Sequence, residues 1–260
     1  MSTRPQLDTP LRKHYNELFT LCRIDADKQA LVDKAAQRIE HNHRRYASAV
    51  IGDLIPWWFV GVVHTMESSG DFTTHLHNGD SLKARTVQVP KGRPLSGTPP
   101  FLWEISARDA LMYAGLTRVQ TWDIAQALYR FEDYNGWGYY NYHPEVNSPY
   151  LWSMTNHYTR GKYIADGTYS TTAVSKQIGA AALLRRLMER GLLVHDNAIA
   201  PRHFNVAFSN RVTVGAEDLQ MFLNRHGAVL RVDGRPGMRT SDAFKKLFGR
   251  YLPNDPRLKV

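Results

Sequence analysis

The feature that most constrains the fold is Trp57–Met66 (WWFVGVVHTM), a segment that is apolar almost all the way round a helix. A helix without a polar face has to be buried on every side, so the rest of the chain must supply elements that surround it. Pro56 just before the segment suits a helix start, and Glu67–Gly70 (ESSG) is typical of a helix end. The sequence therefore predicts a buried central helix that ends at Glu67.

Other segments can surround such a helix. Apolar residues recur at helical spacing in four of them, residues 25–50, 103–114, 121–134 and 173–190. Asp71–Pro90 differs, because Asn78-Gly79 lies between segments rich in β-forming residues and so predicts a β-hairpin. Helices around one small hairpin indicate a mainly α (α+β) fold.

The pattern also predicts two domains. We expect a larger helical domain over residues 1–200 and a small helical module over residues 211–260, with 198–214 as the connector. The chain has 260 residues, 43% of them hydrophobic, which suffices for a large core plus a small one. Its single cysteine, Cys22, excludes an internal disulfide framework and a cysteine-rich zinc module. We expect Cys22 to be a small buried apolar residue.

Membrane and export signals are absent from the sequence pattern. No run of 18 apolar residues occurs, and no apolar segment follows the basic residues near the N-terminus. We therefore expect a soluble protein, made in the cytoplasm without a signal peptide and without integral membrane association.

The charge balance favours anionic partners. Lys and Arg number 33 against 24 Asp and Glu, a net charge of +9. The stretch from Arg211 to Val260 holds ten basic and five acidic residues. Such a balance suits nucleic acid, an anionic membrane surface or the acidic polymers of a bacterial cell wall.

Glu67 is the main candidate for chemistry. A carboxyl at the end of the most hydrophobic helix is partly desolvated, which raises its pKa and suits a general acid that cleaves a glycosidic bond. Asp80 follows thirteen residues later and Thr86 six after that. A hairpin can bring both to the far wall of one cleft, where they would hold water and steady positive charge. The alternatives are a solvated glutamate and an ordinary turn aspartate.

This order of helix, Glu, hairpin, Asp and Thr resembles the lysozyme superfamily of peptidoglycan-cleaving glycosidases over about residues 50–190. The interval from Asp80 to Thr86 is that of phage-type lysozymes, and the longer one from Glu67 to Asp80 is closer to the goose type. The pair Glu67-Ser68 is similar to that of soluble lytic transglycosylases, whose glutamate acts alone. The resemblance implies a lysozyme-like helical domain that cleaves the bond between N-acetylmuramic acid and N-acetylglucosamine. Glu67 would be its acid, and Asp80 and Thr86 would manage water and charge.

An aromatic segment, residues 134–142 (YNGWGYYNY), suits a sugar site, because rings stack on pyranose C–H faces and amides bind N-acetyl groups. It also resembles the Tyr-Asn loop of lytic transglycosylases and a segment of phage endolysin-like muramidases. The alternative is a packed aromatic loop. The predicted substrate-binding residues are Ser68, His77, Tyr134, Asn135, Trp137, Tyr139, Tyr140, Trp152 and Asn156.

Three histidines suggest a second kind of enzyme, one that depends on a metal. His64, His75 and His77 flank Glu67 and Asp80, and such a set could hold zinc in a wall amidase or peptidase. The sequence has no HExxH, however, and alternation along a strand places His75 and His77 on one face without a metal. We expect no metal and no cofactor.

The C-terminal stretch carries the most specific pattern. Leu219-Gln220, Leu223, Val232-Asp-Gly234, Gly237 and Thr240 resemble the small helical peptidoglycan-binding module. Asp233-Gly234 would form a turn and Thr240 would cap a helix. We expect wall binding through Asp233, Arg235 and Arg239, unless the module is a structural copy only.

Together these patterns predict a monomeric peptidoglycan glycosidase that does not bind nucleic acid. It would reach the wall after holin-type release or delivery by a secretion system. The alternatives are a lytic transglycosylase that uses Glu67 alone, a metal-dependent amidase or peptidase, and a non-catalytic wall- or nucleic-acid-binding protein.

Overall fold

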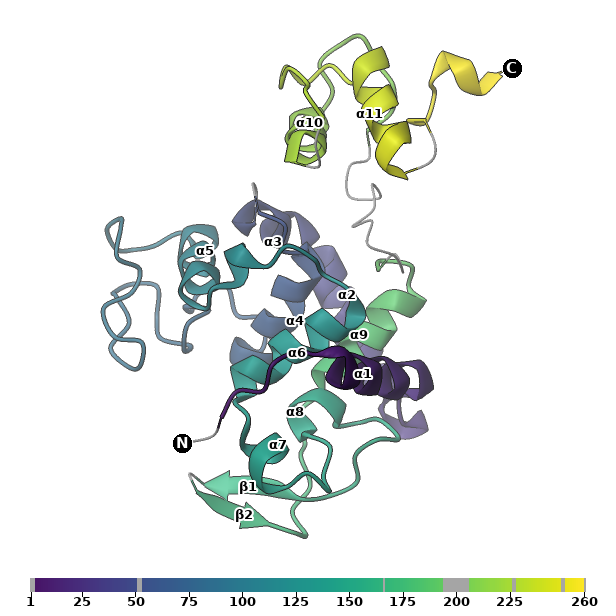
Figure 1. The fold of residues 1–260 in the computed structure, drawn as a ribbon. Coiled ribbons are helices and arrows are strands. Elements are labelled where there is room, and N and C mark those ends of the chain that lie inside the picture. Colours follow the sequence, from purple (N-terminus) through teal and green to yellow (C-terminus); the bar gives the residue numbers. More distant parts are fainter. Residues whose placement is uncertain are drawn as a thin grey trace. The chain divides into compact units, whose positions relative to one another are not determined.

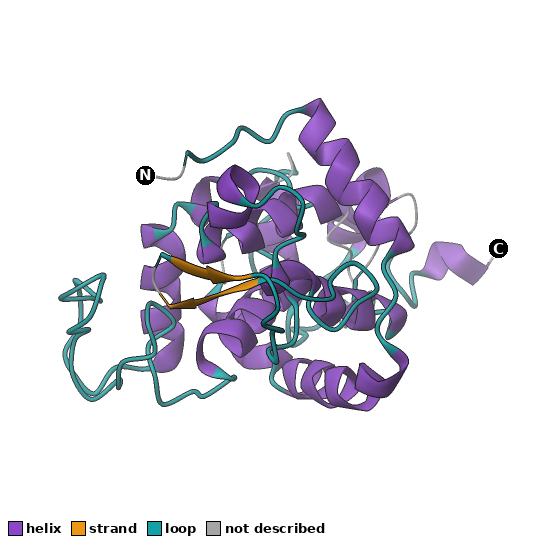
Figure 2. Cartoon of the chain, turned by 90° about the horizontal axis from the view of Figure 1, so that it is seen from below, coloured by secondary structure: helices purple, strands orange, loops and turns teal. Residues whose placement is uncertain are grey.

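The computed structural model describes residues 3–50, 53–165, 167–193, 206–225, 228–248 and 251–259. They form two compact units, of which the first comprises residues 3–50 and 54–193 and the second residues 206–259 (Figure 1). About half of the chain is helical, and the described residues contain one small antiparallel sheet (Figure 2). The predicted mainly α class is confirmed. No helix in these ranges is long and apolar enough to cross a bilayer.

The first unit holds most of the secondary structure. Its helices are α1 (Thr9–Leu21), α2 (Gln29–His41), α3 (His43–Ala49), α4 (Trp57–Ser68), α5 (Trp103–Tyr113), α6 (Ile124–Asn135), α7 (Gly138–Tyr142), α8 (Pro149–Trp152) and α9 (Ala180–Glu189). Short 3-10 turns cover Ala26–Lys28 and Leu116–Arg118. The strands are β1 (Lys162–Ala165) and β2 (Thr168–Ser170), paired with Tyr163 opposite Tyr169.

Helix α4 is the buried central helix that its composition predicts. Trp57–His64 and Met66 are buried, and α2, α3 and α9 pack around the helix. Gly61 allows the close approach of α2, since a Cβ there would lie 2.5 Å from Ile39 Cγ2. The helix ends because Ser69 and Gly70 adopt left-handed backbone conformations, with φ of 53° and 70°. The predicted helix end at Glu67 is thereby confirmed to within one residue.

The other helices follow the sequence with shifted boundaries. Helix α6 begins at Ile124 because the Asp123 side chain accepts a hydrogen bond from Gln126 N at 2.7 Å, a helix N-cap. Helix α9 begins only at Ala180, so residues 173–179 precede it as a non-helical segment instead of forming its first turns. Helix α1, which packs along α6, was not foreseen from the sequence.

The predicted hairpin at Asp71–Pro90 is wrong as a pair of strands. The segment forms a long loop with a single isolated bridge, between Thr74 and Ser81. Side chains bind the backbone N–H groups that a neighbouring strand would otherwise use: Asp80 accepts from Val87 and Gln88. The two-stranded sheet lies instead at 162–170, where no hairpin was expected.

The second unit contains α10 (Ala216–Arg225), α11 (Met238–Phe248) and a 3-10 turn at Pro256–Lys259. Its core comprises Val206, Ala216, Leu219, Leu223, Phe244 and Leu252. Because Val206 belongs to this core, the unit includes residues before the expected start at 211; residues 194–205 lie outside the described part of the chain. Thr240 lies inside α11 and is buried, so its predicted role as a helix cap is wrong.

Candidate functional site

Glu67 lies in the last turn of α4 and is held by a tyrosine from α8. The Tyr150 hydroxyl donates a hydrogen bond to Glu67 Oε1 at 2.5 Å. The Glu67 side chain is exposed to solvent, yet protein atoms crowd its carboxyl, and this desolvation raises the pKa of Glu67. The Tyr150 bond, which stabilises the carboxylate, lowers the pKa and so offsets part of the rise.

A second tyrosine approaches from the end of α6. The Tyr134 hydroxyl oxygen is buried and has no hydrogen-bond partner among the described residues. Burial and the negative charge of Glu67 both raise the pKa of Tyr134. Residues of α6 and α8 therefore lie near the Glu67 carboxyl, although both helices are far from α4 in the sequence.

The non-helical segment before α9 also contacts the end of α4 beside Glu67. Gln177 Nε2 donates to the carbonyl oxygen of Met66 at 2.8 Å, directly beside Glu67. The segment lies tightly against α8, since a Cβ at Gly179 would be 2.4 Å from the Leu151 carbonyl oxygen. Gln177 falls within residues 173–190, which the sequence predicts as a helix, and no local pattern singles out this glutamine as part of a site.

The arrangement can perform acid catalysis. Because desolvation raises the pKa of Glu67, its carboxyl keeps its proton to a higher pH than a free glutamate does, and it can give that proton to a substrate oxygen. Tyr150 then stabilises the carboxylate that remains, because hydrogen bonds to charged acceptors are stronger than those to neutral ones. The exposed side of Glu67 leaves access for a substrate.

The side chains of Asp80 and Thr86 form hydrogen bonds with other groups of the loop 71–102. Backbone N–H groups of Gln88 and Val87 and the Asn78 amide bind Asp80 and lower the pKa of its carboxyl. The Thr86 hydroxyl donates to the Pro90 carbonyl and accepts from Arg93 N at 2.9 Å. None of these interactions joins either residue to Glu67, and their predicted catalytic roles stay predictions.

Several predicted sugar-binding residues serve the packing of the first unit. Trp137 is buried, and its indole N–H donates to Asp133 at 2.9 Å. Trp152 is buried within α8, and the hydroxyl of the buried Tyr139 accepts from Tyr163 N at 3.1 Å. Buried rings offer no face to a pyranose, so these three are structural residues in this fold.

Among the other predicted sugar-binding residues, some bind protein groups and others are exposed to solvent. Asn156 binds backbone atoms of Leu21 and Arg23, and the Ser68 hydroxyl donates to the His64 carbonyl at 3.1 Å. Asn135 and Tyr140 are exposed at the end of α6 and in α7, close in sequence to Tyr134. They remain the candidates of this group that a glycan could contact.

The three histidines bind protein groups. His64 is buried between the Tyr46 hydroxyl and the Asp71 carbonyl, and burial lowers its pKa to about 4. His75 binds the Ser106 hydroxyl at 2.6 Å, and His77 binds the Asp109 carboxylate at 2.8 Å. The predicted substrate-binding residue His77 is therefore bonded to the protein itself, through Asp109. Within the described ranges no three His, Cys, Asp or Glu side chains are grouped so as to hold a metal ion.

Cys22 is fully buried, as expected. Burial raises the pKa of its thiol to about 11, so the nucleophilic thiolate is disfavoured.

In the second unit, the Gln220 side chain forms hydrogen bonds with Asp233, Gly234 and Thr240, three residues of the pattern seen in the sequence. Its amide nitrogen donates to Asp233 Oδ1 at 3.0 Å and to the Thr240 hydroxyl at 3.3 Å, and its oxygen accepts from the backbone N–H groups of Asp233 and Gly234. Asp233 is therefore part of the turn itself. Arg235 and Arg239 are exposed and remain available to an anionic partner.

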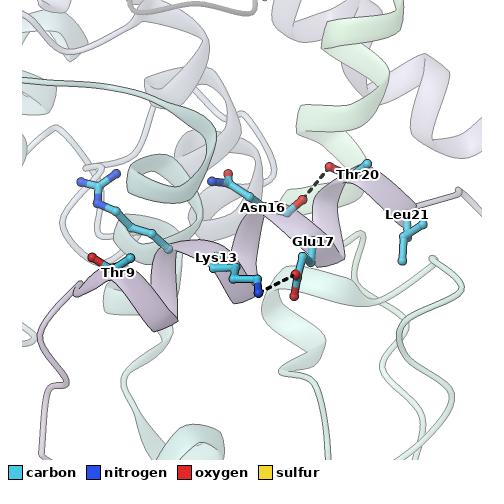
Figure 3. A pocket seen from close by; sticks show the side chains of 7 residues that line it. Thr9, Lys13, Asn16, Glu17, Thr20 and Leu21 are labelled. Atoms are coloured by element: carbon cyan, nitrogen blue, oxygen red, sulfur yellow. Dashed lines mark hydrogen bonds and ion pairs between the residues drawn. The ribbon is translucent and has the colours of Figure 1, made fainter.

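A hollow of about 600 Å³ lies elsewhere, along α1 (Figure 3). Its lining residues are Thr9, Arg12, Lys13, Asn16, Glu17, Thr20 and Leu21. Its charged side chains are paired with protein groups, Lys13 with Glu17 and Arg12 with Asp123. The hollow does not include Glu67.

Comparison of the chain with models of protein families, with curated proteins and with solved structures found no match.

Proposed function

We propose that the first unit is a glycosidase that cleaves the bond between N-acetylmuramic acid and N-acetylglucosamine in peptidoglycan. The observation that carries the proposal is Glu67, an exposed residue whose carboxyl is desolvated, at the end of the buried helix α4. The hydrogen bond that Tyr150 donates would stabilise the Glu67 carboxylate after the proton has left.

In the proposed step, Glu67 gives its proton to the glycosidic oxygen while the bond from C1 to that oxygen breaks. The sugar left behind becomes oxocarbenium-like. In a hydrolase, water held by Asp80 and Thr86, the predicted residues, adds to C1 and gives its proton to the Asp80 carboxylate, and exchange with solvent then returns a proton to Glu67. The products then have ordinary reducing ends.

A lytic transglycosylase is the second candidate, because one carboxylate oxygen of Asp80, Oδ2, already accepts hydrogen bonds from two backbone N–H groups of the loop. In that reaction the 6-hydroxyl of the same sugar adds to C1 and returns its proton to the Glu67 carboxylate. The products carry 1,6-anhydro ends, and no second carboxylate is needed.

The second unit supports a cell-wall substrate. Its sequence resembles a peptidoglycan-binding module, and the exposed Arg235 and Arg239 could contact anionic wall groups. We propose that this unit keeps the protein on the wall while the first unit cleaves glycan strands.

The substitution Glu67→Gln tests the proposal, because it removes the transferable proton and keeps the shape. General acid catalysis contributes about 10²–10⁴-fold, so lysis of purified walls should be lost while folding and wall binding are retained. Mass spectrometry of the digested walls distinguishes reducing ends, anhydro ends and cleaved peptides. Activity within tenfold of the parent, or products cleaved only in the peptide, would contradict the assignment.

A further inference from the structure

Aliphatic side chains are exposed on the loop 71–102 and on α5, the helix that follows it. In the loop, Val89 is 86% exposed, Leu95 71% and Val87 68%. The exposed residues of α5 and of its N-cap position are Leu102, Ile105, Met112 and Tyr113. We call these residues together the loop–α5 surface. Single exposed apolar residues are ordinary, but several that lie together mark a place where another molecule binds.

Hydrogen bonds hold the loop against the side of α5 that carries these residues. The Arg93 guanidinium donates to both oxygens of the Asp109 carboxylate, at 2.8 and 3.0 Å, and His77 binds the same carboxylate at 2.8 Å. Asp109 lies four residues after Ile105 and three before Met112, so all three share one side of the helix. Figure 1 shows the loop beside α5, extending away from the other helices of the first unit. The exposed residues of the loop and of α5 therefore lie on one side of this unit.

Hydrogen bonds within the loop order the backbone that carries its exposed valines. Asp80 Oδ2 accepts from the backbone N–H groups of Val87 and Gln88 at 2.8 and 3.1 Å. The Thr86 hydroxyl accepts from Arg93 N at 2.9 Å. The polar groups of the loop thus bind one another, and the valine side chains are left to solvent. A surface that is already ordered loses little conformational entropy when it binds a partner.

The charge of the loop is positive. Residues 81–102 contain four basic residues and no acidic one. Lys83 and Lys91 are exposed, and neither forms an ion pair within the described ranges. Both acidic residues of α5 are paired with arginines of the first unit. A partner of the loop–α5 surface would therefore meet lysine charge beside aliphatic side chains.

An anionic lipid bilayer fits this combination. Aliphatic side chains can enter the boundary between headgroups and acyl chains, and lysines beside them can reach the lipid phosphates. Interfaces between proteins are instead depleted in lysine and enriched in arginine and aromatic residues. We propose that the loop–α5 surface binds the surface of an anionic bilayer without crossing it. This binding would be independent of the proposed glycosidase activity.

Vesicle binding by the full chain tests the proposal. Vesicles made of equal parts of phosphatidylglycerol and phosphatidylcholine are compared with vesicles of phosphatidylcholine alone in a sedimentation assay. The protein should bind the mixed vesicles about tenfold more tightly or better. Added salt should weaken this binding, because it screens the lysine charges. A protein that shows no preference for the mixed vesicles would overturn the proposal.

The double variant V87S/V89S tests the apolar contribution. It should bind the mixed vesicles about tenfold more weakly, because less apolar surface enters the bilayer. The matched control is L31S/V174S, which makes the same kind of change at two exposed residues elsewhere in the first unit and should bind as the parent does. Parental binding by V87S/V89S would contradict the proposal. A parent that is a dimer in sedimentation velocity and binds no vesicles, with V87S/V89S a monomer, would assign the surface to a second copy of the chain instead.

The double variant K83Q/K91Q tests the charge. Each lysine near an anionic surface strengthens binding about fivefold, so the loss of both should weaken it about 25-fold. The control K34Q/K176Q removes the same charge from exposed positions outside the loop and should stay within about twofold of the parent. Equal losses in the two variants would show that net charge alone attracts the protein, and the assigned surface would be wrong.

A fluorescent label reports insertion of the loop directly. Cys22, the single cysteine of the chain, is fully buried, so a cysteine introduced at an exposed position can be labelled selectively. Val89→Cys labelled with nitrobenzoxadiazole should brighten and shift to the blue when mixed vesicles are added, because the dye leaves water. Labelled Val174→Cys should keep its spectrum. An unchanged V89C spectrum in protein that sediments with the vesicles would refute the assignment of this surface.

Discussion

The bond from Tyr150 to Glu67 makes a specific prediction about Tyr150→Phe. The substitution removes one oxygen and keeps the ring, which is buried in α8. In the proposed reaction Glu67 gives up its proton in the transition state, and the Tyr150 hydroxyl, 2.5 Å away, would then face a growing negative charge. A hydrogen bond to a charged group contributes about 1.5–3 kcal/mol. Because the Glu67 side chain is exposed, water can replace part of that bond.

We therefore expect the lower part of the range, a loss of about 1.5–2 kcal/mol at the transition state, which is about 10–30-fold in kcat. The pH profile should move as well. If Glu67 is the general acid that we propose, it must be protonated to act, so activity should fall as the pH rises through its pKa. Loss of a bond that lowers this pKa shifts the alkaline limb to higher pH. The variant is expected to be slower at its optimum and active to a higher pH.

The assay is initial-rate digestion of purified walls between pH 4 and 9, with Tyr129→Phe as the control. Tyr129 is equally buried in the first unit, but its hydroxyl donates to the Pro5 carbonyl at 2.7 Å and accepts from Arg4 at 2.8 Å. Y129F should keep the parental pH profile. A Y150F protein with parental kcat and an unmoved alkaline limb would refute the role given to this bond.

Two further predictions concern the choice between a hydrolase and a transglycosylase and the role of the second unit. In a hydrolase, Asp80→Asn and Thr86→Ala should each lower activity about tenfold or more, a loss of ~1.4 kcal/mol at the transition state, and the products should carry reducing ends by mass spectrometry. Near-parental activity with mainly anhydro ends would instead make Asp80 and Thr86 loop residues of a transglycosylase. A chain ending at Leu193 should bind purified walls more weakly in a sedimentation assay yet still cleave short soluble glycans, because the first unit has its own core. An insoluble truncated protein would contradict this independence.

The sequence by itself determined the central element of the first unit. Trp57–Met66 has no polar face, and that local property requires burial wherever the helix packs. The left-handed stop at Ser69 and Gly70 follows from local residues too, so the place of Glu67 at a helix end could be predicted. In the second unit, the turn at Asp233-Gly234 was predictable for the same reason.

Only the tertiary structure decided what surrounds Glu67. Tyr150 and Gln177 lie 83 and 111 residues from their partners in α4, and each contact depends on how α8 and the segment before α9 pack. Helix α8 is too short to produce a helical period in the sequence. The loop 71–102 was misjudged for a related reason: β-forming residues predict strands, but the Asp80 and Thr86 side chains compete for the backbone groups that strands would pair. Local patterns specify elements, whereas the groups that meet at a site are selected by long-range packing, which no window of sequence contains.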